Sequence, residues 1–223
     1  FVISPLFWFL LLPKSNFSIK KKIKAPTKIV FQVNDKKIYE SFFSNIINKF
    51  EGQDYLIEGD GFNIPSIKNN LTIAQIIYLT IVFTIIWPLI TLISIFYFTN
   101  YHRVLVRSTF VYFKTLNHFT RYPCDNYFTY QDNSCSAPFY LAFKKMGGKN
   151  LIAFQNGIRN RKEGIDGSCF DYLFAMSQFS VDLYKECQSM IKNYEIIGSM
   201  NIYNNPKLIE KKPILTDVLF IDQ

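Results

Sequence analysis

The chain has 223 residues, a length that suits one large domain or one domain with part of a second. Hydrophobic residues make up 49% of it, which is enough for a substantial core and excludes disorder of the whole chain. The formal net charge is +8 at pH 7, with widely spread lysines. That balance fits nucleic acid, an anionic membrane surface or phosphorylated substrates. No RNA-binding signature or zinc-finger spacing occurs, and we expect no nucleic-acid partner.

The cysteines and histidines are too few and too far apart for a metal centre. The four cysteines are Cys124, Cys135, Cys169 and Cys187, and their spacings match no zinc or redox motif. Only two histidines are present, which excludes a histidine-rich metal site. We therefore predict no metal site, and reduced thiols of the kind found in a cytosolic compartment.

The first part of the chain predicts the start of a β–α–β unit. The predicted elements, in chain order, are a buried strand at 7–12, a strand at 28–33, a helix at 39–50 and a strand at 54–58, followed by a loop at 59–70. The strand at 28–33 reads KIVFQV and ends in Asn34-Asp35, a turn sequence. Apolar residues at spacings of three and four indicate the helix. Strand, turn and helix in this order are typical of an α/β fold.

Residues 73–98 contain no charged residue and are interrupted by Pro88. As one helix this segment would be about 39 Å long, and the hydrocarbon core of a bilayer is about 30 Å thick. A single crossing, however, would put the strands before and after it on opposite sides of the membrane, where they cannot share a sheet. We expect a kinked helical pair, broken near Pro88, that is buried or dips into one leaflet, with both ends on one side of the sheet domain. A true span is the alternative, and Tyr97, Tyr101, His102, Arg103 and Arg107 suit an interfacial anchor.

The second half of the chain alternates regularly between short apolar runs and helical patterns. The predicted elements are strands at 126–130, 151–154, 172–176 and 195–197, and helices at 136–145 and 180–191. We expect parallel strands whose tips at Asp132, Gln155 and Gly198 lie along one edge. Residues 211–213 are typical of a linker, and 217–221 would open a new sheet. Both ends of the chain look cut.

Three of these strands are followed by polar tips: residues 131–133, 155–159 and 198–201. Ligands of open parallel sheets bind beyond the carboxyl ends of the strands. Carboxamides, an arginine and glycine turns can hold sugar hydroxyls and phosphates. The predicted substrate-binding residues are Asn133, Gln155, Asn156, Gly157, Arg159, Gly198, Ser199 and Asn201. The alternative is that Asn and Gly only form the turns, and no dinucleotide or P-loop motif is present.

Four segments in order carry a resemblance to a known family: YQDNS (130–134), FQNGIRN (154–160), FDYLFAMSQFSVDLY (170–184) and IIGSMNIYNN (196–205), followed by VLFIDQ. Together they resemble bacterial surface-carbohydrate (O-antigen-type) biosynthesis proteins. Those proteins are in turn similar to GT-B glycosyltransferases and glycerophosphate transferases. The resemblance covers residues 8–223, most clearly from 126 onward.

The resemblance implies two Rossmann-like domains that face a cleft, with the acceptor in the front domain and the nucleotide-linked donor in the rear one. Residues 1–210 would then be a truncated N-terminal, acceptor-side α/β domain with an inserted apolar helical segment. Residues 211–223 would be the linker and first strand of the donor domain. The implied donor is a nucleotide-activated sugar or polyol, and no cofactor is bound by this part of the chain. The implied partners are a carbohydrate or lipid-linked acceptor and, by peripheral contact, the cytoplasmic face of the cell membrane.

The resemblance also bears on the catalytic base. Glycerophosphate transferases of this superfamily carry a histidine where this chain has Asn156, and an asparagine does not accept a proton at neutral pH. Asp132 is the predicted base instead, because transfer requires deprotonation of the acceptor hydroxyl. Arg159 is the predicted contact for a phosphate or acidic sugar, since its fork matches such oxyanions. The alternative is that Asp132 caps the helix near Ser136 and that Arg159 only pairs with Glu163 or Asp166.

Two other functions fit the sequence. One is a non-catalytic, membrane-associated scaffold with a degenerate GT-B fold. The other is an integral membrane protein that spans the bilayer at 73–98.

Overall fold

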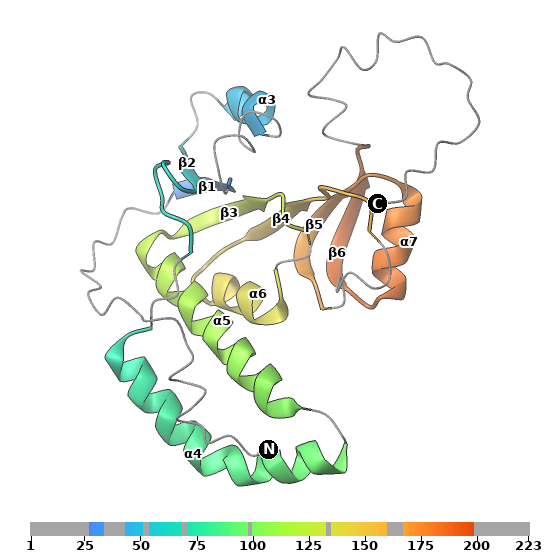
Figure 1. Ribbon diagram of the computed structural model, residues 1–223. Coiled ribbons are helices and arrows are strands. Elements are labelled where there is room, and N and C mark those ends of the chain that lie inside the picture. Colours follow the sequence, from blue (N-terminus) through green and yellow to red (C-terminus); the bar gives the residue numbers. More distant parts are fainter. Residues whose placement is uncertain are drawn as a thin grey trace.

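The computed structural model describes residues 27–33, 43–50, 54–67, 71–97, 100–132, 135–159 and 167–198. Within them the chain forms an α/β domain around a six-stranded parallel sheet, as a Rossmann-like fold does (Figure 1). The strands are β1 (Thr27–Gln32), β2 (Tyr55–Glu58), β3 (Cys124–Thr129), β4 (Asn150–Phe154), β5 (Cys169–Ala175) and β6 (Met190–Ile196). The helices are α3 (Ser44–Ile47), the 3-10 turn η2 (Asn48–Phe50), α4 (Ile73–Phe96), α5 (Tyr101–Arg121), α6 (Ala137–Lys145) and α7 (Gln178–Glu186).

The strand order is β2-β1-β3-β4-β5-β6, and every neighbouring pair is parallel. The predicted parallel arrangement of the second half of the chain is therefore confirmed. The sheet grows from β1 toward β2 and then, after the two long helices, from β1 in the opposite direction through β3. Strand order thus reverses between β1 and β3. In open α/β sheets the carboxyl end of such a reversal is where ligands bind.

The two faces of the sheet bury different layers. On one face, strand residues such as Tyr127 and Leu151 pack against Phe119 of α5, Phe143 of α6 and Tyr184 of α7. The opposite face carries a row of phenylalanine rings from β1, β3, β4 and β5, which are Phe31, Phe128, Phe154 and Phe174. Neighbouring rings in this row have centroids 4.8, 6.2 and 5.0 Å apart. The side chain of Phe43 and that of Ile47 in α3 complete this second core.

The apolar segment forms one helix, and the expected break at Pro88 is absent. Figure 1 shows α4 changing direction along its length, which accommodates a residue that cannot donate a backbone hydrogen bond. Phe83 and Trp87, which precede the proline, pack against α5, and Thr91, which follows it, lies 3.0 Å from the ring of His102 in α5. The expected pair of helices within 73–98 is therefore not formed, and α4 instead packs against α5, a helix that the sequence analysis did not predict. Both ends of α4 belong to a hairpin on one side of the sheet (Figure 1).

Other boundaries differ from the prediction mainly at the edge of the sheet. The helix expected at 180–191 ends at Glu186 as α7, and β6 begins at Met190 instead of 195. β6 is an edge strand with mostly exposed side chains, so it lacks the apolar pattern that marks a buried strand. The helix expected at 39–50 is described only as α3 and η2. The predicted elements at 7–12, 211–213 and 217–221 lie outside the described residues.

Candidate functional site

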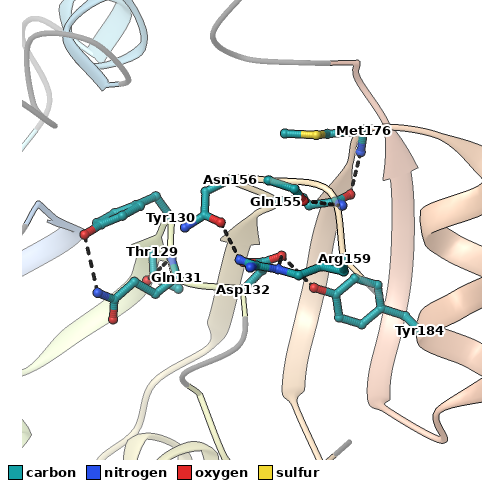
Figure 2. A network of polar contacts seen from close by, with 10 residues as sticks. Thr129, Tyr130, Gln131, Asp132, Gln155, Asn156, Arg159, Met176 and Tyr184 are labelled. Carbon is teal, nitrogen blue, oxygen red and sulfur yellow. Dashed lines mark hydrogen bonds and ion pairs between the residues drawn. The ribbon is translucent and has the colours of Figure 1, made fainter. Parts of the chain in front are cut away.

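A cluster of polar side chains lies where β3 and β4 end (Figure 2). Asp132 follows β3 by three residues, and Asn156 and Arg159 lie on the segment that leaves β4. Because the two strands are parallel neighbours, their carboxyl ends meet at the same edge of the sheet. Tyr184 reaches the cluster from α7, the helix that follows β5. Residues from distant parts of the chain thus meet at one place.

The carboxylate of Asp132 is fully buried and accepts three hydrogen bonds. Nε of Arg159 donates to Oδ2 over 3.0 Å, and the same oxygen accepts from the hydroxyl of Tyr184 over 2.6 Å. The terminal nitrogen of Arg159 donates to Oδ1, so the arginine binds the carboxylate with two prongs. The Arg159 side chain is 13% exposed. Removing either partner of a buried pair leaves the other charge unsatisfied, so each depends on the other.

These contacts keep the donors protonated. The hydrogen bond to Asp132 raises the pKa of Arg159, outweighing the opposing effect of burial. Burial raises the pKa of the Tyr184 phenol, and the neighbouring carboxylate of Asp132 raises it further. Tyr184 is therefore a neutral hydrogen-bond donor at every physiological pH, and Arg159 is a permanent cation. A negative charge on Asp132 is balanced within the cluster.

The segment after β4 is shaped by its own carboxamides. Asn156 accepts a hydrogen bond from the terminal nitrogen of Arg159 through Oδ1. Gln155 is buried; its side-chain nitrogen donates to the carbonyl of Gly157, and its oxygen accepts from the backbone N–H of Met176, both over 2.8 Å. Gln155 therefore ties the segment after β4 to the end of β5 (Figure 2). These two hydrogen bonds of Gln155 hold the backbone segment that carries Asn156 and Arg159.

The sequence reading missed several polar residues at the reversal of strand order. The hydroxyl of Thr129 donates to Oε1 of Gln32 over 2.6 Å, across the β1–β3 boundary. The same Thr129 oxygen accepts from the backbone N–H of Gln131 over 3.0 Å, and the Gln131 carboxamide donates to the Tyr130 hydroxyl. A signal was available for Gln32, because it is the last residue of a strand that ends in a polar turn. Tyr184 had none, since it occupies an ordinary apolar position of an amphipathic helix.

The predicted site residues separate into three groups. Arg159 donates hydrogen bonds to both Asp132 and Asn156, and Gln155 and Gly157 lie on the same segment as Asn156. Gly198 follows β6, two strands beyond β4, and has φ +77. Asn133, Ser199 and Asn201 lie outside the described residues. One alternative role was that Asp132 caps the helix that starts near Ser136; in the structure the Asp132 carboxylate binds Arg159 instead. The other was that Arg159 pairs with Glu163 or Asp166, and both of these residues lie outside the described residues.

The arrangement amounts to an ionic latch, by which we mean the paired Asp132 and Arg159 with Tyr184 and Asn156 as their hydrogen-bond partners. Its guanidinium is the type of group that binds phosphates and carboxylates, and its carboxylate is the type that accepts a proton.

No three His, Cys, Asp or Glu side chains of the described residues are placed to hold a metal ion. Comparison with protein-family models, with curated proteins and with solved structures found no match to the chain.

Proposed function

We propose that this chain is the acceptor-side domain of a glycosyltransferase-like enzyme that acts on a surface-polysaccharide precursor at the cytoplasmic face of the cell membrane. In this proposal the domain is the front half of a GT-B-type protein, and the donor, a nucleotide-activated sugar or polyol, is held by a second domain. The observation that carries the proposal is the ionic latch at the carboxyl edge of the parallel sheet, beside the reversal of strand order.

Asp132 is the base in this proposal. It accepts the proton of the acceptor hydroxyl while the acceptor oxygen forms a bond to the transferred carbon or phosphorus atom of the donor. The bond from that atom to the leaving nucleotide phosphate breaks, and the phosphate takes the electron pair. No oxidant or reductant is required. A positioned carboxylate of this kind contributes roughly a hundredfold or more to the rate.

Arg159 would control when that base is available. In the closed latch both Asp132 oxygens accept hydrogen bonds from Arg159, so the carboxylate is not free to take a proton. A phosphate or acidic sugar competes for the same guanidinium fork. Binding of such a group would draw Arg159 away and leave Asp132 held by Tyr184. Binding of the substrate would thus free the Asp132 carboxylate to act as the base. The hydrogen bond to Asn156 would keep Arg159 close to the end of β4.

The test uses the protein from the complete reading frame. Purified protein is mixed with a membrane lipid extract as acceptor and with a panel of nucleotide sugars and CDP-glycerol, and release of nucleotide is followed. Asp132→Asn keeps the size of the side chain and removes the basic carboxylate, so turnover should fall at least about a hundredfold. Tyr184→Phe is the matched variant, because it removes one hydrogen bond to Asp132 and leaves the carboxylate in place. Retention of turnover within about tenfold by Asp132→Asn would exclude Asp132 as the base.

A second candidate, a non-catalytic scaffold with a degenerate GT-B fold, is favoured by the complete burial of Asp132. A carboxylate with 0% exposure and three donors is also what a purely structural pair has. On that reading no donor of the panel is consumed. Asp132→Asn would then lower the unfolding temperature and change nothing else.

A further inference from the structure

The outer face of α4 is apolar along its whole length. Thirteen of the twenty large hydrophobic residues that are exposed in the described part of the chain lie between Ile73 and Val104. Ile85 is 72% exposed and Phe96 is 84% exposed. Nine of these thirteen residues, Ile73, Ile77, Tyr78, Ile81, Ile85, Leu89, Leu92, Ile95 and Phe96, form what is called the α4 stripe below. At about 1.5 Å per residue it is about 36 Å long, far more than the scattered apolar residues of an ordinary surface.

The other face of α4 is occupied. Leu79, Phe83 and Trp87 pack with Val106 of α5, so the stripe is the surface that remains after the hairpin has formed. Figure 1 shows α5 between α4 and the rest of the domain. Sheet and hairpin therefore leave the stripe pointing away from the core.

The threonines and Gln75 of α4 are hydrogen-bonded within the helix or to α5, whereas the indole Nε1 of Trp87 is buried without a hydrogen-bond partner among the described residues. The hydroxyls of Thr80, Thr84 and Thr91 each donate to the carbonyl one turn earlier, over 2.7 to 2.9 Å. The carboxamide of Gln75 exchanges two hydrogen bonds with that of Asn117 in α5. Thr91 also lies 3.0 Å from the ring of His102. Groups that are satisfied in this way tolerate surroundings without water, as hydrocarbon requires.

The charge of this region has one sign. Between Asp60 and Asp125 the sequence has no acidic residue, whereas α5 carries Arg103, Arg107, Lys114 and Arg121. Arg103 and Arg107 are exposed near the end of the hairpin that is remote from the sheet. A long apolar stripe beside basic residues, with no acidic ones, is complementary to a surface of anionic phospholipids. A second copy of the chain would bring the same positive charges together.

We propose that the α4–α5 hairpin docks on an anionic lipid bilayer, with the α4 stripe lying in the plane of one leaflet and Arg103 and Arg107 at the lipid phosphates. The exposed tyrosines Tyr78, Tyr97 and Tyr101 take the headgroup level, where such rings concentrate. This surface lies outside the ionic latch, and the proposal stands whether or not the protein is a transferase.

Topology supports docking in the plane over crossing. α4 is the helix of the described residues whose length and composition permit a crossing. β1 precedes it and β3 follows α5, and these two strands pair directly, so any crossing by α4 has to be reversed by α5. Lys114 stands near the middle of α5, where a charge in hydrocarbon is costly. An in-plane hairpin keeps every charge of α5 at or above the phosphates.

The binding test uses the full chain and vesicles that float on a density gradient. Vesicles of phosphatidylcholine with about 30% phosphatidylglycerol should bind the protein, pure phosphatidylcholine should bind it at least tenfold less, and added salt should weaken binding. Ile85→Asp and Leu89→Asp should each reduce binding about tenfold or more, since each removes a large aliphatic side chain from the lipid. Phe179→Asp is the matched control, because Phe179 is 68% exposed on α7, outside the stripe.

The charge contribution has its own pair of variants. Arg103→Gln and Arg107→Gln should each weaken binding to the anionic vesicles about fivefold, while Lys145→Gln, exposed on α6, should not change it. Equal binding to both vesicle types, or aspartates in the stripe without effect, would overturn the proposal. So would a chain that forms dimers through the stripe and ignores vesicles.

Depth separates lying in the plane from spanning. Nitroxide labels on Ile81→Cys and Ile95→Cys, each in a Cys187→Ser background, report how deep two well-separated positions of the α4 stripe lie in the bilayer. In-plane docking places both labels at one depth. A spanning helix places them about 20 Å apart in depth, given about 1.5 Å per residue, and that result would overturn the proposed orientation.

Discussion

Nε2 of His118, in the last turn of α5, lies 3.1 Å from Oε2 of Glu58, the last residue of β2. Both side chains are buried, and the same carboxylate oxygen accepts a hydrogen bond from the hydroxyl of Tyr127 on β3 over 2.8 Å. The other oxygen accepts from the backbone N–H of Ile67 over 3.2 Å. Glu58 therefore joins two strands, one loop and the base of the hairpin through a single carboxylate.

Removing that carboxylate should destabilise the fold strongly. We expect Glu58→Ala to lower the free energy of unfolding by about 3–5 kcal/mol, because it leaves two buried polar groups, His118 and the Tyr127 hydroxyl, without their hydrogen-bond partner. Tyr127→Phe removes only one hydrogen bond and should cost about 1–2 kcal/mol. Urea unfolding followed by circular dichroism measures both. A loss below about 1 kcal/mol for Glu58→Ala would show that the carboxylate does not join these elements.

The ionic latch predicts strong coupling between its two charges. In a double-mutant cycle with Asp132→Asn and Arg159→Gln, we expect a coupling free energy of about 1–3 kcal/mol, because the pair is buried and bound by two prongs. The matched pair is Lys149 and Asp125, whose side chains are 69% and 38% exposed and 2.9 Å apart. Exposed pairs of that kind contribute about 0–1 kcal/mol. Equal coupling in the two cycles, measured by urea unfolding, would mean that the latch is not a special contact.

Asp171 predicts how stability depends on acid. Burial alone would raise the pKa of this carboxylate, but hydrogen bonds from Lys144, the backbone N–H of Leu151, Lys192 and Tyr140 outweigh it and lower the pKa to about 2. The unfolded chain protonates an aspartate near about pH 3.9, so the stabilisation is complete above that pH and disappears as pH falls toward 2. The unfolding temperature of the wild type should fall across this window.

The Asp171→Asn variant gives the comparison. Its stability should already be reduced at neutral pH, and the difference from the wild type should narrow between about pH 4 and pH 2. Calorimetry at a series of pH values measures both curves. If the difference in unfolding temperature between the wild type and Asp171→Asn stayed constant from about pH 4 to pH 2, the loss of stability in acid would not come from protonation of Asp171.

Two glycines should respond oppositely to alanine. A Cβ on Gly59 would lie 1.8 Å from the backbone oxygen of Val33, so Gly59→Ala must displace β1 or the turn after β2 and should prevent or severely weaken folding. A Cβ on Gly157 meets no atom within 4 Å, so Gly157→Ala should leave the unfolding temperature unchanged. If the segment after β4 contacts a ligand through its backbone, the same variant should weaken that binding. Comparable unfolding temperatures for both variants would refute the close approach at Gly59.

The elements buried on both sides were predictable from apolar runs. Residues 28–33 and 151–154 were assigned as strands, and the structure has β1 and β4 there. β6 was half missed because Lys192 and Asn193 are exposed on an edge strand, and an edge has no burial to impose a pattern. α5 was overlooked beside its apolar neighbour, although Val106, Phe110 and Phe113 recur at the spacing of a helix.

The sequence by itself determined the parallel α/β architecture, since each short apolar run ends in a polar turn and alternates with a helical pattern. It also marked Asp132 and Arg159 as polar residues at strand ends. Only the tertiary structure decided that these two bind each other, 27 residues apart, and that Tyr184, 52 residues from Asp132, completes the latch. Pairing of this kind depends on which loops the strand order brings together, and no local pattern encodes that order. The packing partner of α4 was likewise decided by the tertiary structure, because the apolar pattern of a helix shows which face is buried but not which element covers that face.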